Sequence, residues 1–338
     1  MATPAVQEAA RLADEVLFPA APAVDLAARV PPSHLEALAA AGLYGAAVPV
    51  EQGGLGLSGA DHCRVVEHLA SGCLATTFVW LQHHSLVRSL AAGGGDDGLR
   101  RRWLGPLCAG RTRAGIALGG LLPGPPRLTA RRRDGGWLLD GHSPWVTGWG
   151  LVDVLQVAAR GPDDACVWLA VEPTAGGLRA ERQRLVAVDA SSTVSLAFEG
   201  VAVDDGALVR LEPYEQAAAE YAANLRANGS LALGVARRCC RIVGPGPLDD
   251  DLDRCREALD RASPAAMPSA RAAASALAHR AAGAAVARSG SGSLLAGHHA
   301  QRLAREALFL LVFGSRPAIR QDLLARLGAA SGPDPIPA

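Results

Sequence analysis

The chain has 338 residues, with 33 basic and 33 acidic side chains and a formal net charge of zero. Its hydrophobic share of 49% excludes an intrinsically disordered protein, and the balanced charge argues against a broad nucleic-acid or acidic-membrane surface. Apolar runs such as residues 308–313 are far too short to cross a bilayer, so we expect no membrane span.

The N-terminus and the cysteines bear on the cellular compartment. Residues 1–17 mix Gln, Glu, Arg and Asp with Ala, so we expect no secretory signal. The seven cysteines are scattered and include no C-x-x-C pair, which indicates reduced thiols in a cytoplasmic protein. Every basic side chain is arginine, which excludes Schiff-base chemistry and a P-loop lysine.

The first hundred residues have the spacing of helices. Ser33 and Glu36 have the pattern of a capping box, which predicts a helix that begins there. Ser58 followed by Asp61 predicts a second start, and a third helix is expected over about residues 74–90. The glycines and aspartates of residues 93–98 then end the helical pattern.

The pattern changes near Arg111 and changes back at Pro213. Short apolar or alternating runs separated by Gly, Pro and Asp indicate antiparallel strands in a sandwich or barrel, and residues from Pro213 to about Val243 have the spacing of one long amphipathic helix. We therefore predict an α+β fold of three domains. These are an N-terminal helical domain (1–110), a central antiparallel β-domain (111–212) and a shortened C-terminal helical bundle (213–330).

Two short motifs are weak signals by themselves. Residues 54–59 match G-x-G-x-x-G, but no clean strand precedes them and no acidic residue follows at the right distance, so a structural turn is favoured over a dinucleotide site. The pairs His83-His84 and His298-His299 point apart on a helix, which favours a pocket or surface role over zinc; we expect no metal.

The most informative segment is Trp145-Val146-Thr147-Gly148, which follows the residues Asp-Gly-Gly-Trp-Leu-Leu-Asp-Gly at 134–141. Taken locally, it is a hairpin in which Trp145 fills the core. It is also similar to the D-G-x-x-L-x-G and W-I-T-N segments of the acyl-CoA dehydrogenase superfamily. Residues 49–58, Pro-Val-Glu-Gln-Gly-Gly-Leu-Gly-Leu-Ser, resemble that superfamily's P-E-x-x-G-G-x-G-x-S loop, and the order of helices, strands and helices agrees.

The resemblance implies FAD as the cofactor, lying against the β-domain. It implies that Thr147 offers its hydroxyl to the flavin N5 and that Trp145 packs beside the ring, with Val146 between them in the same cofactor-binding segment. A donor at N5 stabilises the charge that develops there, and an indole covers the apolar ring. Leu118 and Gly119 would face the pyrimidine end of the flavin through their backbone.

The chain also departs from the family pattern. The T-E-P-x-x-G-S-D loop is replaced by residues 118–126, and the R-x-x-F-G segment for the adenosine half of FAD by the acidic residues 245–251. The Gly-rich G-G-x-G segment is not recognisable, so FAD would be held weakly or by other contacts.

The catalytic base is a further departure. The family segment E-[RK]-x-x-R-D-A corresponds to residues 301–307, which places Gln301, an amide that accepts no proton near neutral pH, at the base position. Relatives with the base on the long helix would place it near Asn224, with Glu220 one turn earlier. The catalytic base is therefore unassigned. Glu306 is expected to form a structural ion pair with Arg302 or Arg305.

The resemblance implies oxidation of the Cα–Cβ bond of an acyl-CoA or other acyl thioester, with an electron-transfer flavoprotein or similar acceptor and a homo- or hetero-oligomer. Three alternatives remain open at this point. The chain could be a non-catalytic subunit of a heteromeric complex, a flavin-dependent monooxygenase on the same fold, or a purely structural component of an oligomer.

Overall fold

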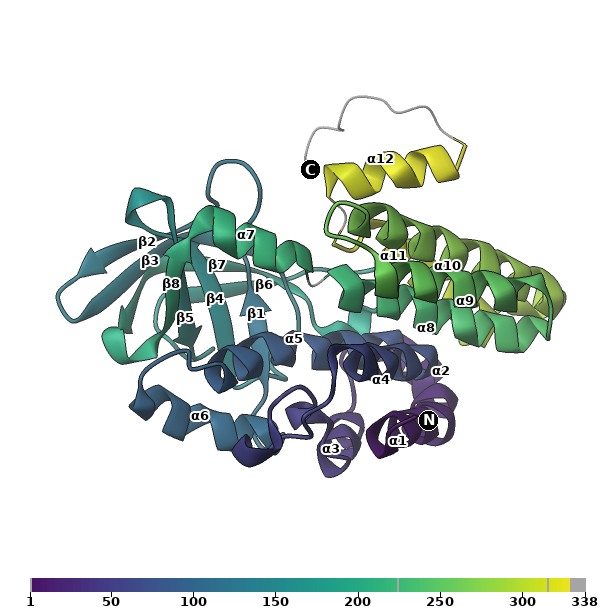
Figure 1. Cartoon of the computed structure of the whole chain (residues 1–338), viewed down its shortest axis with the longest axis horizontal. Coiled ribbons are helices and arrows are strands. Elements are labelled where there is room, and N and C mark those ends of the chain that lie inside the picture. The colour runs from purple at the N-terminus through teal and green to yellow at the C-terminus, as the bar shows by residue number, and fades with distance from the viewer. Residues whose placement is uncertain (1, 224, 315, 329–338) are drawn as a thin grey trace.

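Helices, a sheet and more helices follow one another along the chain in the computed structural model, which describes residues 2–223, 225–314 and 316–328 (Figure 1). The predicted α+β fold is confirmed, with one difference in the sheet that is given below. Among the described helices, none combines the length and the apolar character that crossing a bilayer requires.

Six α-helices make up the N-terminal part, and they are α1 (Pro4–Leu12), α2 (Phe18–Leu26), α3 (Pro32–Ala40), α4 (Gly59–Gly72), α5 (Leu74–Ala91) and α6 (Asp97–Cys108). The start predicted for α4 is confirmed, because the Ser58 hydroxyl accepts a hydrogen bond from the Asp61 N–H at 3.1 Å. The helix predicted near Ser33 is confirmed as α3, but the predicted capping box is wrong: Pro31 is the N-cap, and no side chain caps the helix. Proline at the first helical position has a suitable φ and leaves no donor to satisfy.

Eight strands form the central sheet, and they are β1 (Ala114–Ala117), β2 (Leu128–Arg133), β3 (Gly136–Val146), β4 (Val154–Arg160), β5 (Ala165–Val171), β6 (Leu178–Arg182), β7 (Val194–Asp204) and β8 (Leu208–Pro213). Their order is β6-β7-β3-β2-β4-β5-β8, with β1 beside β4. The sheet is mixed, and not purely antiparallel as was predicted, because β1 pairs with β4 in parallel. The β2–β3 hairpin lies between these two strands in the sequence.

Helices return after the sheet, and they are α7 (Tyr214–Ala223), α8 (Leu225–Val243), α9 (Pro247–Arg261), α10 (Met267–Ser289), α11 (His299–Val312) and α12 (Pro317–Arg326). The residues that were predicted to form one long helix are helical in α7 and α8, and residue 224 between them lies outside the described residues. In Figure 1, α7 lies beside the sheet and α8 lies in the helical bundle.

One close helix crossing joins the two helical parts. Helix α8 packs on α4 from the N-terminal part and on α9, α10 and α11 from the C-terminal part. At the crossing, a Cβ on Gly234 would lie 2.4 Å from the carbonyl oxygen of Glu67 and 2.7 Å from the Ala70 Cβ. Only glycine allows this approach, and one continuous hydrophobic core includes residues from both helices.

The glycine-rich loop before α4 is a structural turn, as the sequence favours. A Cβ on Gly54 would lie 2.1 Å from the carbonyl oxygen of Val48, so the loop packs against its own neighbouring backbone. Gly53 and Gly56 have φ angles of 87° and 60°, which glycine adopts without strain.

A cluster of buried histidines lies behind this loop, between α4 and α5. The rings of His62 and His84 are 4.7 Å apart, and Trp80 lies 4.4 Å from His84. The surface role considered for His83 and His84 is wrong, since both are about 1% exposed. Burial lowers the pKa of His62 and of His83, to about 4 and about 3, and the pKa of His84 well below its usual value.

The close crossing of α4 and α8 predicts the effect of a methyl group there. Gly234→Ala should lower the free energy of unfolding by about 1–3 kcal/mol, because the added methyl forces the helices apart. Gly283→Ala is the matched control: it lies in α10 with no atom within 4 Å of an added Cβ, and it should stabilise the helix by about 0.5–1 kcal/mol. Denaturant unfolding of both variants measures the difference, and equal stabilities would contradict it.

The histidine cluster predicts acid sensitivity. Between pH 6.5 and about 4, histidines of the unfolded chain bind protons while the buried rings of the folded protein stay neutral. The free energy of unfolding therefore has its full value above pH 6.5 and falls as the pH is lowered. The slope should approach about 1.4 kcal/mol per pH unit for each such ring. His62→Phe removes one of these rings, so the free energy of unfolding of this variant should depend less on pH between pH 7 and 4. If its slope against pH equals that of the wild type, the buried His62 is not a cause of the acid sensitivity.

Candidate functional site

Two segments that are far apart in the sequence meet at the predicted cofactor face. Gly119 follows β1, and a Cβ there would lie 2.4 Å from the carbonyl oxygen of His142 and 3.1 Å from the Ser143 Cα. The residue is buried, so its backbone lies directly against β3. The structure thus places Leu118 and Gly119 beside the end of β3, two residues before Trp145.

The end of β3 carries a strained bulge. The register of β3 against β7 shifts between Ser143 and Val146, and Trp145 in the bulge has a φ of 60°. This left-handed conformation costs an L-residue about 1–2 kcal/mol. It turns the indole outward, so that Trp145 is 64% exposed and does not fill the core as the local hairpin interpretation proposed. Strain of this kind clusters at functional sites.

The next two residues point into the protein. Val146 is fully buried in the core of the sheet. Thr147 is 2% exposed, and its hydroxyl oxygen lies 3.1 Å from that of Thr193, which in turn lies 2.8 Å from the Ser191 hydroxyl. The Thr147 hydroxyl is therefore already in a hydrogen-bonded chain. By contrast, the buried hydroxyl of Ser143 has no hydrogen-bond partner among the described residues.

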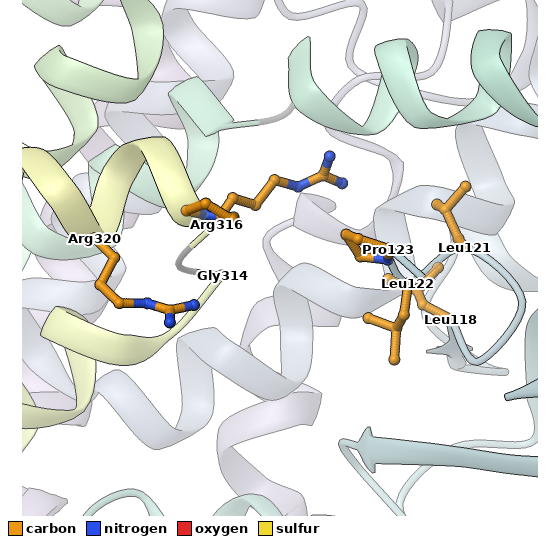
Figure 2. A pocket seen from close by; sticks show the side chains of 8 residues that line it. Leu118, Leu121, Leu122, Pro123, Gly314, Arg316 and Arg320 are labelled. Atoms are coloured by element: carbon orange, nitrogen blue, oxygen red, sulfur yellow. The ribbon is translucent and has the colours of Figure 1, made fainter. Parts of the chain in front are cut away.

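A cavity of about 270 Å³ lies next to Leu118, between the β1–β2 connection and the turn from α11 to α12 (Figure 2). The residues that line it come from these two segments, and they are Leu118, Leu121, Leu122, Pro123, Gly314, Arg316, Pro317 and Arg320. Trp145, Val146 and Thr147 are not among them. Leu118 is therefore the one predicted cofactor residue that reaches this cavity.

Gln301 lies away from the cavity beside Leu118 and is held by Arg305. Its side-chain oxygen accepts a hydrogen bond from Arg305 at 2.9 Å, and Arg305 also binds the Val186 carbonyl oxygen and forms an ion pair with Asp25 on α2. Gln301 does not line the cavity described above.

The other candidates considered for a base are accounted for separately. The predicted ion pair of Glu306 is confirmed with Arg302, at 2.5 Å in the core, where burial raises the pKa of Glu306. Glu220 pairs with Arg210 at 2.6 Å on the exposed side of α7, and Asn224 lies outside the described residues. None of the described residues that line the cavity is a carboxylate or an imidazole. Likewise, no group of three or more potential ligands among the described residues is arranged to hold a metal ion.

The acidic segment at 245–251 is the start of a helix. Asp249 accepts a hydrogen bond from the Gly246 N–H at 2.9 Å and so caps α9. Asp251 forms ion pairs with Arg254 and Arg280. Acidic side chains at a helix N-terminus are favourable, so this stretch has a structural explanation.

Sequence reasoning missed the two arginines of the cavity. Arg316 and Arg320 are one helical turn apart after Gly314, a spacing that the sequence shows. In a chain whose 33 basic residues are all arginine, such a pair does not stand out.

The comparisons with known proteins all find acyl-CoA dehydrogenases or one of their domains. A family model described as "Acyl-CoA dehydrogenase, N-terminal domain" matches residues 4–111. Benzylmalonyl-CoA dehydrogenase of Aromatoleum aromaticum is 29% identical over 68% of this chain, and short-chain specific acyl-CoA dehydrogenase of Bos taurus is 27% identical over 55%. The matches span 63% and 48% of the lengths of these two relatives.

A solved structure shows the same fold. Butyryl-CoA dehydrogenase from Megasphaera elsdenii superposes with a TM-score of 0.81, over 96% of this chain and 98% of that one, at 18% identity.

The bulge predicts an unusual response to substitution. Trp145→Gly should be more stable than Trp145→Ala by about 1 kcal/mol, because glycine adopts a φ of 60° without strain while both variants lose the same exposed indole. Thermal or denaturant unfolding measures the difference. If alanine is as stable as glycine at this position, the bulge is not strained in solution.

Proposed function

Because the chain belongs to the acyl-CoA dehydrogenase superfamily, we propose that it is a flavoprotein that oxidises the Cα–Cβ bond of an acyl thioester with FAD as electron acceptor. The observation that carries the proposal is the exposed, left-handed Trp145 on the bulge of β3, next to the backbone of Gly119. The relatives' names do not fix the acyl group: they give a benzylmalonyl group for one and a short-chain acyl group for the other.

Three features of this face fit a flavin. The Trp145 indole offers an exposed aromatic surface for a flat apolar ring. The absence of a Cβ at Gly119 lets the β1–β2 connection pack directly on β3, which holds this backbone at the edge of the proposed face. The unpartnered hydroxyl of Ser143, buried at the same edge, supplies hydrogen-bonding capacity that the protein itself does not use.

When bound, FAD supplies a hydride acceptor at its N5 atom. In this chain Trp145 would cover the ring and exclude water, while Leu118 and Gly119 would contact its edge through their backbone. The Thr147 hydroxyl would be the donor toward N5, in place of the hydrogen bond that it shares with Thr193. Val146 keeps the segment in place from within the core. These four roles are our proposal for the cofactor site.

The proton acceptor is not assigned. The family base position reads Gln301, whose amide accepts a hydrogen bond from Arg305 and cannot take a proton from a thioester. This observation favours a second candidate function, a non-catalytic subunit that pairs with a complete partner chain.

The remaining parts of the proposal concern the context of the reaction. We propose a cytoplasmic protein of lipid metabolism that works as a homo- or hetero-oligomer and passes electrons to an electron-transfer flavoprotein or similar acceptor. We also propose that residues 1–110, 111–212 and 213–330 are its three domains.

The visible spectrum of the purified, FAD-reconstituted chain tests the proposal. We expect flavin bands that bleach when an acyl-CoA is added without oxygen. Flavin that binds only after a partner chain is added would support the subunit function instead. Reductase-dependent oxygen consumption would support a monooxygenase.

The role of Trp145 has its own matched pair of variants. Trp145→Leu should weaken FAD binding by about tenfold, because the aromatic face is lost, and Trp145→Phe should stay close to wild type. Titration of the apoprotein with FAD measures both affinities. Equal affinities for the Leu and Phe variants would place the flavin elsewhere.

A further inference from the structure

The turn that follows β1 carries the backbone of the proposed cofactor edge, and most of its carbonyl groups are bound by backbone donors. The Leu118 carbonyl oxygen accepts a hydrogen bond from the Leu121 N–H at 3.0 Å, which closes the turn. The Gly119 carbonyl oxygen accepts one from the Arg127 N–H at 3.3 Å. The carbonyl of the buried Gly120 is different, because no backbone N–H in the part of the chain that the structure describes donates to it.

A side chain from the end of β4 satisfies this acceptor. The Arg160 guanidinium donates to the Gly120 carbonyl oxygen from both Nε and Nη2, at 3.2 Å each. Its third nitrogen, Nη1, binds Asp164. The Arg160 side chain is 11% exposed, so its hydrogen bonds to Gly120 are largely shielded from water. Hydrogen bonds from a charged donor are strong in such a setting.

An aromatic ring also contacts this guanidinium. The Arg160 Cζ lies 3.5 Å from the centre of the Tyr214 ring, within the range of a cation–π contact. Tyr214 is the first residue of α7, the helix that lies beside the sheet (Figure 1). Arg160 therefore joins three segments, which are the turn after β1, the short turn that contains Asp164 and the start of α7.

Strand β4 binds Gly120 from both sides of this residue. The Gly120 N–H donates to the Ala158 carbonyl oxygen at 2.9 Å, and a Cβ on Gly120 would lie 2.5 Å from the Ala159 Cα. The carbonyl on the other side is bound by Arg160. The two peptide groups that flank Gly120 are thus both oriented by β4, one through a backbone bond and the other through the guanidinium.

We propose that Arg160 is a positioning residue for the cofactor: it holds the Gly120 carbonyl, and through it the Leu118–Gly119 backbone at the edge of the flavin ring. The cofactor in this inference rests on the function proposed above, whereas the hydrogen bonds of Arg160 are properties of the fold. Arginine suits this role better than lysine, because a planar guanidinium donates two hydrogen bonds while it stacks on a ring.

Two measurements on the full chain test the inference, and neither requires turnover. Amide hydrogen exchange of the apoprotein reports on the turn, and titration with FAD reports on the cofactor site. Arg160→Met keeps the apolar stem but removes the donors, so exchange over residues 118–127 should be about tenfold faster and FAD should bind about tenfold more weakly. Arg160→Lys should recover part of both effects, because it keeps the charge and one donor group.

Two control variants separate this role from a general loss of charge or of stability. Arg131→Met removes another arginine of the sheet, which is 69% exposed and pairs with Asp140 at 2.8 Å. Asp164→Asn weakens the ion pair of Arg160 and leaves its hydrogen bonds to Gly120 in place. Both controls should bind FAD like the wild type, and melting temperatures show whether each variant is folded.

Faster exchange with an unchanged FAD affinity would leave Arg160 a structural role only and overturn the inference. Weaker FAD binding without faster exchange, or an equal loss of affinity in Asp164→Asn, would also overturn it, because the turn would then not carry the effect. If Arg160→Met does not fold, the same comparison is made with Arg160→Lys, for which a smaller change in the same direction is expected.

Failure of the proposed function gives a different result. A wild-type chain that binds no FAD would contradict that function and the cofactor role of Arg160 together, while faster exchange in Arg160→Met would still show that the guanidinium holds the turn. A chain that binds FAD with equal affinity in Arg160→Met and Arg131→Met would contradict only the inference about Arg160.

Discussion

The conformation of a single residue determines which side chains the β-domain presents. In a regular strand Trp145 would alternate with its neighbours and could pack into the sheet. The register shift against β7 instead holds Trp145 at a φ of 60°. The indole therefore points outward, while the next two residues, Val146 and Thr147, stay buried. The proposed cofactor face depends on this arrangement, because it combines the buried Val146 and the hydrogen-bonded Thr147 with one exposed aromatic ring.

The rest of the fold brings distant segments to this face. Helix α8 crosses α4 closely at Gly234 and also packs on α10 and α11, so the helices before and after the sheet share one core. The turn that follows α11 thereby lies across a small cavity from the loop that follows β1. The two segments that line that cavity are almost 200 residues apart in the chain, a distance that follows from positions 118–123 and 314–320.

Local signals in the sequence predicted local structure well. Ser58 caps α4 because its hydroxyl reaches the Asp61 N–H, and the same pattern at Ser33 failed because the preceding prolines already start α3. The change from helical to strand texture located the sheet. The parallel pairing of β1 with β4 was missed, since it depends on a crossover that no local pattern specifies.

The site was only partly predictable for the same reason. Resemblance pointed to Leu118, Gly119, Trp145 and Thr147, and the structure brings the first two next to β3. Nothing in the order of residues indicates that the Thr147 hydroxyl is shared with Thr193, or that Arg316 faces Leu118 across a cavity. These relations arise from tertiary packing. The burial of His83 and His84 was also not predictable, because two adjacent histidines are polar residues and their sequence does not show that the core encloses them.

The most direct measurement is a crystal structure of the chain reconstituted with FAD. We predict the flavin ring in contact with the Trp145 indole and the Gly119 backbone, with the left-handed bulge retained. A flavin seated away from β3, or a regular strand with this indole packed into the sheet, would contradict the account.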